Sequence, residues 1–126
     1  KNAYFTGQKK VDELPAYITA YDVCINPQMV NDITDGNYPL KIDEYLAMGK
    51  PTVATSTHTM RHIFADHTHL ATNPEEWLSA IDRAVTEADD KELAKQRIAF
   101  AETHSWGHSV KKIYGIIDNF LKEKAT

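Results

Sequence analysis

Short apolar runs alternate along this chain with segments in which apolar residues recur at helical spacing. The short runs are bounded by turn residues, which is typical of buried strands. The segments with helical spacing follow capping residues or proline, which is typical of helix starts. Strands are expected at residues 3–5, 23–26, 52–55 and 68–71, helices at residues 11–21 and 39–48, a loop with a short helix at 56–66, and further helices beginning at Asn73, Asp89 and Ser105.

The alternation of strands and helices predicts an α/β fold, namely a Rossmann-like parallel sheet with flanking helices and a helical C-terminal tail. One domain covering residues 1–126 is expected, since this length suits a single core. The apolar stripes of the last helices are expected to cover one side of the sheet. The side chains expected to be buried in that layer are Trp77, Ile81, Val85, Val110, Ile113 and Ile117.

Composition and charge narrow the classes of function. The chain is 42% hydrophobic with a net charge of −4, so nothing in its overall charge attracts nucleic acid or a membrane surface. The one cysteine, Cys24, lies in an apolar run, where a buried, unreactive thiol is expected. A single cysteine cannot form a disulfide within the chain, which fits a reducing compartment. No apolar run is long enough to span a bilayer.

The most informative segment is residues 35–55, which read D-G-N-Y-P-L-K-I-D-E-Y-L-A-M-G-K-P-T-V-A-T. Pro39 suits the first position of a helix, because its ring presets φ and its missing N–H needs no partner there. The cap position then falls on Tyr38, whose side chain cannot accept hydrogen bonds from the amides that follow. Alternatively, Asn37 or Asp35 reaches back and caps the helix.

An uncapped helix start leaves the N–H groups of Leu40, Lys41 and Ile42 free at the positive end of the helix dipole. With the charge of Lys41 beside them, these amides suit an anion such as a diphosphate. Glu44 lies one turn further on a similar face, where its carboxylate can accept hydrogen bonds from ribose hydroxyls or pair with Lys41. Asp43 is turned about 100° round the helix, so its replacement by alanine is expected to change nucleotide affinity little.

The run P-L-K-I-D-E-Y-L-A-M-G-K-P-T-V-A-T resembles the donor-binding signature of retaining glycosyltransferases of the GT-B fold, group 1, family 4-like. Two flanking segments also resemble this family, Y-F-T-G-Q near the start and H-S-W-G-H-S-V-K-K-I-Y near the end. The resemblance implies that the chain is the C-terminal, nucleotide-sugar-binding domain of such an enzyme. It also implies that an N-terminal acceptor domain and the first strands of this domain are missing, so that the fragment alone is inactive.

The resemblance implies roles for individual residues. Glu44 would hold the ribose, and the start of the helix with Lys41 would hold the diphosphate. Many family members carry a glutamate at the position of Gly36, so either Asp35 makes the sugar contact in its place or this subgroup dispenses with that contact. Lys41 and Asp35 are the candidates for catalysis. The expected donor-binding residues are Glu44, Lys41, Leu40, Pro39, Tyr38, Gln8 and Lys9, the last two beside the base.

The implied activity is transfer of a hexosyl unit, with retention, from a UDP- or GDP-sugar to an acceptor glycan or lipid-linked glycan. Such an enzyme would serve cell-surface polysaccharide or glycoconjugate synthesis in a bacterium, in the cytoplasm or at the inner face of the membrane. Neither a cofactor nor a metal is expected, and nucleic acid is not an expected partner. The alternatives are an NDP-sugar epimerase-like enzyme and a doubly wound protein-interaction module without catalysis.

Two other groups of residues have the composition of a catalytic or metal site, but neither has the full pattern. His58 and His62 have a spacing that can bind zinc, but the segment between them lacks the glutamate of zinc proteases. Ser56, His58 and Asp66 lack the G-x-S-x-G elbow that exposes a nucleophile.

The predicted sheet has fewer strands than the about six that are usual for this fold. Its completion is therefore expected through a second copy at a sheet edge or through a displaced first strand at residues 3–5.

Overall fold

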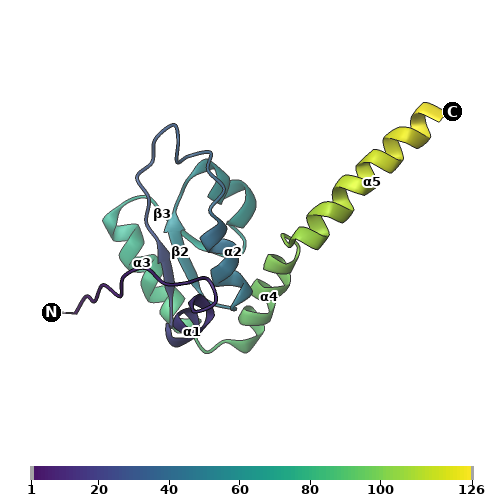
Figure 1. Cartoon of the computed structure of the whole chain (residues 1–126). Coiled ribbons are helices and arrows are strands. Elements are labelled where there is room, and N and C mark those ends of the chain that lie inside the picture. Colours follow the sequence, from purple (N-terminus) through teal and green to yellow (C-terminus); the bar gives the residue numbers. More distant parts are fainter. Residues whose placement is uncertain (1, 126) are drawn as a thin grey trace.

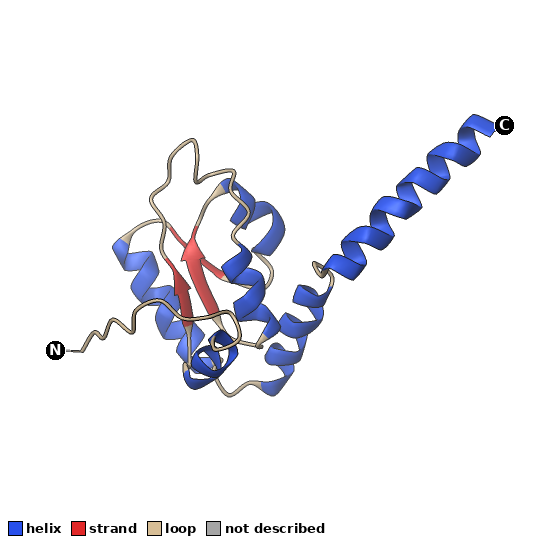
Figure 2. Ribbon diagram, viewed as in Figure 1, coloured by secondary structure: helices blue, strands red, loops and turns tan. Residues whose placement is uncertain are grey.

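A central parallel sheet with helices on both faces forms the body of the protein, and the computed structural model describes residues 2–125 of it (Figures 1 and 2). The three strands lie in the order β1-β2-β3. Ile25 of β1 pairs with Val53 of β2, and Ala54 of β2 pairs with Leu70 of β3. The elements in chain order are α1 Leu14–Ala20, β1 Cys24–Asn26, α2 Leu40–Ala47, β2 Thr52–Thr55, the π-helix η1 Met60–Phe64, β3 His69–Ala71, α3 Pro74–Thr86, α4 Lys91–Glu102 and α5 Trp106–Ala125. The Rossmann-like α/β prediction is confirmed.

The middle strand β2 is buried on both faces, because successive side chains of a strand point to opposite sides. On one face, Val53 packs in a cluster with Ala80 and Ala84 of α3. On the other face, Ala54 belongs to a second cluster formed mainly by α2, η1 and α4. The members of this second cluster are Ile42, Leu46, Ala54, Met60, Phe64 and Ala101.

The helix boundaries follow the capping residues that the sequence indicates. The Asn73 side chain accepts a hydrogen bond from the Glu76 N–H at 2.9 Å and caps α3. Asp90 caps α4 in the same way. After α2, Gly49 takes a φ of +73°, and a Cβ at this position would lie 3.1 Å from the Cβ of Ala94. Glycine is therefore required both for the backbone turn and for the close approach of α4.

The predicted strand at residues 3–5 is wrong. This segment is extended but unpaired, with the Phe5 side chain 100% exposed. The displaced-strand completion of the sheet is also wrong, because in residues 2–125 the only strand beside β1 is β2. The observed strands are neighbours in sequence and in space, so the sheet has no internal gap, and its two edge strands are β1 and β3. A strand needs a partner for its backbone groups, and residues 3–5 have none here.

Helix α5 projects away from the body of the molecule (Figure 1). The predicted burial of its apolar face is wrong, since Val110, Ile113 and Ile117 are 45%, 56% and 46% exposed. On α3, Trp77 and Ile81 do pack against the sheet, whereas Val85 is exposed. The apolar periodicity correctly indicates an amphipathic helix, but periodicity does not specify what covers the apolar face.

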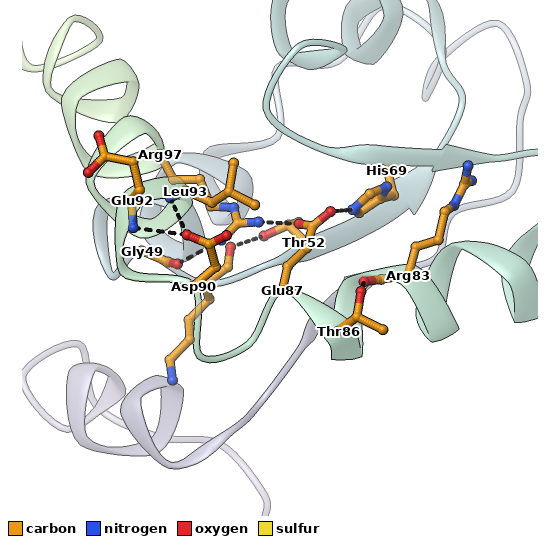
Figure 3. Close-up of polar contacts among 11 residues, drawn as sticks. Gly49, Thr52, His69, Arg83, Thr86, Glu87, Asp90, Glu92, Leu93 and Arg97 are labelled. Carbon is orange, nitrogen blue, oxygen red and sulfur yellow. Dashed lines mark hydrogen bonds and ion pairs between the residues drawn. The ribbon is translucent and has the colours of Figure 1, made fainter.

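An ion pair between a buried arginine and a half-buried glutamate holds the turn between α3 and α4 against the sheet (Figure 3). Arg97 is only 5% exposed, and its guanidinium donates to the Glu87 carboxylate and to the Gly49 carbonyl. The other oxygen of Glu87 lies 2.9 Å from Nε2 of His69 on β3. Glu87 therefore joins α4 to the third strand, while Arg97 contacts Gly49, which follows the C-terminus of α2.

Candidate functional site

Helix α2 begins at the carboxyl-terminal edge of the sheet, where ligands bind in open α/β folds. Pro39 occupies the cap position rather than the first helical position, so the helix starts one residue later than predicted, at Leu40. The Ile42 N–H donates to the Pro39 carbonyl at 2.9 Å. Within residues 2–125 the N–H groups of Leu40 and Lys41 have no hydrogen-bond partner. Two of the three amides expected to be free are therefore free.

No side chain caps α2, so the alternative in which Asp35 or Asn37 caps it is wrong. Asp35 instead fastens the following loop, accepting a hydrogen bond from the His58 N–H at 2.7 Å through Oδ1. Its carbonyl accepts from the Thr59 N–H at 3.3 Å. One carboxylate oxygen of Asp35 is thus engaged by a backbone N–H. Asp35 also borders a hollow together with Gly36 and His58.

A cavity of about 610 Å³ brings three of the predicted donor-binding residues together, Lys9, Lys41 and Glu44. It lies between the N-terminal segment, α1, the open edge of β1 and α2. In the described part of the chain Lys41 and Glu44 form no ion pair with each other or with another residue. The surface pair weighed from the sequence is therefore not formed, and both charges face the cavity unpaired.

The remaining predicted residues lie outside this cavity. Tyr38 and Leu40 border a second hollow of about 600 Å³ on the other side of α2, beside Trp106. Gln8 is exposed, and it borders neither the cavity nor the second hollow. The structure therefore divides the predicted set: Lys9, Lys41 and Glu44 converge, while Tyr38 and Leu40 face away from them across α2.

The floor of the second hollow is a hydrogen-bonded group that the sequence did not indicate. The Tyr38 hydroxyl donates to Oδ2 of Asp43 at 2.5 Å. Nδ1 of His104, at the end of α4, lies 2.8 Å from Oδ1 of the same carboxylate and 3.2 Å from the Tyr38 hydroxyl. Burial, followed by the hydrogen bond to Asp43, raises the pKa of Tyr38, so the hydroxyl keeps its proton and remains a donor.

Asp43 has a structural role that its position on the helix did not predict, because it is the centre of this group. Rotation by about 100° does carry Asp43 away from Glu44, but it brings Asp43 to Tyr38 and α4. One feature of the sequence could have indicated the contact between Tyr38 and Asp43. Tyr38 directly precedes the cap residue and Asp43 is the fourth residue of the helix, and side chains at these two positions lie next to each other.

The histidines do not gather into a metal centre. The rings of His58 and His62 lie next to each other, with centroids 4.2 Å apart. Across residues 2–125 no group of three or more His, Cys, Asp or Glu side chains is placed to hold a metal ion. Buried Cys24 lies away from both rings on β1, and burial raises the pKa of its thiol to about 11. This thiol is therefore protonated at neutral pH.

The parallel sheet, the free amides at the start of α2 and the charged cavity beside them are typical of nucleotide-binding α/β domains. Comparison with known families identifies this one: residues 1–87 match the family described as glycosyl transferases group 1. Because the match covers more than half of the chain, the protein belongs to this family. The resemblance noted in the sequence is confirmed.

One curated relative is "Putative teichuronic acid biosynthesis glycosyltransferase TuaH" of Bacillus subtilis (strain 168). It is 27% identical over 115 residues, which are 89% of this chain and 29% of the relative. The chain thus spans less than a third of that protein's length. No solved structure matches the chain. Between residues 2 and 125, none of the helices is both long and apolar enough to cross a membrane.

Proposed function

We propose that this chain forms the nucleotide-sugar-binding C-terminal domain of a GT-B glycosyltransferase. The observation that carries the proposal is that α2 begins with two free amides and that the unpaired charges of Lys41 and Glu44 border the cavity beside this helix. Amides at a helix start and a lysine suit a diphosphate. A carboxylate one turn further along the same helix suits the ribose hydroxyls. Family membership supports this assignment over an isolated surface feature.

In this proposal the residues of the chain stabilise the departing nucleoside diphosphate while the glycosidic bond breaks. The Leu40 and Lys41 amides and the Lys41 ammonium face the charge that develops on the leaving group, which is an electrostatic role. Lys9 borders the cavity with its ammonium 5.0 Å above the Tyr17 ring, which places a cation on an aromatic face where the base would lie. Gln8 is a neighbouring contact for the base.

For the sugar, Asp35 is the proposed contact. Its Oδ1 is engaged by the His58 N–H, so recognition of a sugar hydroxyl falls to Oδ2. Transfer of a hexosyl unit with retention is proposed from the family, and neither a metal nor a cofactor is required by the residues proposed here. The acceptor base and acceptor site belong to parts of the enzyme outside this chain, and this chain alone is expected to be inactive.

The acceptor is proposed to be a glycan or lipid-linked glycan in bacterial cell-surface polysaccharide synthesis. The support is the relative, whose printed name refers to teichuronic acid biosynthesis. We also propose a location in the cytoplasm or at the inner face of the membrane. A UDP- or a GDP-sugar fits the proposed contacts equally, because these contacts address ribose and diphosphate.

Incubating the full-length protein with UDP- and GDP-hexoses and a glycan acceptor tests this function. We expect release of nucleoside diphosphate that depends on the acceptor, together with a product whose anomeric proton coupling in NMR matches that of the donor. Conversion of the donor sugar into its epimer without acceptor would favour the epimerase-like alternative. Absence of nucleotide binding in calorimetry would leave the interaction module as the better description.

A further inference from the structure

We infer that Tyr38, Asp43 and His104 form a positioning group that fixes the direction in which the free amides of α2 point. The inference rests on the proposed function, because it concerns how the diphosphate-binding end of α2 is held. The three side chains come from the segment before α2, from α2 itself and from the turn between α4 and α5. All three contacts among them lie between 2.5 and 3.2 Å.

The first part of the argument is the position of the two α2 residues. Pro39 is the cap, so Tyr38 precedes the cap and Asp43 is the fourth residue of the helix. In many helices an apolar pair at these two positions packs together and sets the angle at which the chain approaches the helix. Here the hydroxyl of Tyr38 donates to the Asp43 carboxylate instead. A hydrogen bond therefore takes the place of the apolar contact.

Such a link matters more in this helix than in one with an ordinary cap. Proline at the cap position has no side-chain acceptor, and no other side chain caps α2. Without the Tyr38–Asp43 bond, the helix start keeps the bond from the Ile42 N–H to the Pro39 carbonyl, and Tyr38 keeps its contacts with His104 and Phe64, but among the described contacts no side chain of α2 itself holds Tyr38. The orientation of the next two amides then depends directly on how Tyr38 is held.

The second part is His104, which attaches this link to the turn that follows α4. With a carboxylate as the partner of Nδ1, this nitrogen carries a proton and donates. The imidazole also sits among aromatic rings, with its centroid 4.7 Å from that of Phe100 and 5.6 Å from that of Phe64. The Tyr38 ring packs on Phe64 as well, at 5.6 Å. Side chains of α4 and η1 thus restrict both partners of Asp43.

The test compares two probes on the full-length protein, uridine diphosphate and inorganic pyrophosphate, by calorimetric titration. Tyr38→Phe keeps the ring and removes the hydroxyl, and His104→Leu removes the donor. Each change is expected to weaken both probes about fivefold, the effect of one hydrogen bond. His104→Asn should retain near wild-type affinity, because its amide N–H can reach the place of Nδ1–H. A role in stability alone would not distinguish asparagine from leucine in this way.

His108→Leu is the matched control. This histidine borders the same hollow, but its ring contacts Ser105 rather than Asp43, so both affinities should remain unchanged. Variants that bind both probes as wild type does would overturn the positioning role alone. An equal loss for asparagine and leucine at position 104 would overturn it too. A wild-type protein that binds neither uridine nor guanosine diphosphate nor pyrophosphate would overturn the proposed function together with this inference.

Discussion

Replacing Glu44 by alanine is expected to weaken nucleoside diphosphate binding at least tenfold in the full-length protein. A carboxylate that accepts hydrogen bonds from ribose hydroxyls makes charge-assisted contacts, each contributing about 1.5–3 kcal/mol. A loss of about 1.4 kcal/mol corresponds to a factor of ten in the dissociation constant. Glu44 is exposed in the cavity that also contains Lys41, and in residues 2–125 no ion pair engages it. Calorimetric titration measures the change.

Two further probes and a control variant show whether the lost affinity of Glu44→Ala comes from a ribose contact or from a lost charge. Glu44→Ala should bind inorganic pyrophosphate as wild type does and should no longer distinguish a nucleotide from its 2′,3′-dideoxy analogue. Asp43, although adjacent, is unsuitable as a control because it holds Tyr38 and His104. Asp82→Ala, an exposed change on α3, is the better control for lost charge. Equal losses for Glu44→Ala and Asp82→Ala would remove Glu44 from the site.

Replacing Glu87 by leucine is expected to reduce the free energy of unfolding by about 3–5 kcal/mol, the usual cost of leaving a buried charge without its partner. The guanidinium of Arg97 is nearly fully buried, and after the change its remaining described contact is the Gly49 carbonyl at 3.3 Å. His69 loses its partner on Glu87 at the same time. Chemical denaturation followed by far-ultraviolet circular dichroism measures the effect.

A double variant separates the loss of attraction from the cost of the remaining charge. Combining Glu87→Leu with Arg97→Met should recover most of the lost stability, because replacing both buried partners by apolar groups is often neutral. Lys95→Ala breaks the exposed pair with Glu92, whose atoms are 3.7 Å apart, and should cost at most about 1 kcal/mol. A double variant no more stable than Glu87→Leu alone would contradict the role assigned to the buried charge.

The sequence predicts well those parts of the fold whose causes are local. Asn73 and Asp90 accept hydrogen bonds from the next amides of their own helices, and Gly49 adopts the positive φ that ends α2. Each effect acts within a few residues, so the residue type is sufficient to predict it. The burial of β2 follows similarly from an apolar run between two helices.

The errors concern partners that are distant in sequence. Residues 3–5 have strand-like composition, but a strand forms only beside another strand, and none lies there. The apolar face of α5 likewise needs a partner surface to be buried, and its residues are exposed. In the candidate site, the spacing within α2 predicts that Glu44 and Lys41 share a face, and the cavity confirms this proximity. His104 could not be found in this way, because its contact with Asp43 depends on how α4 packs against α2.

Because α5 is exposed, the two tryptophans of the molecule lie in different environments and can report separately by fluorescence. Trp106 is 87% exposed at the start of α5, so its emission belongs to the solvated, long-wavelength class and is open to collisional quenchers. Trp77 is partly buried where it packs against the sheet from α3, so its indole is partly shielded and responds to unfolding of the body. Replacing either tryptophan by phenylalanine isolates the other signal. A change at α5 can then be recorded optically without confusing it with a change in the core.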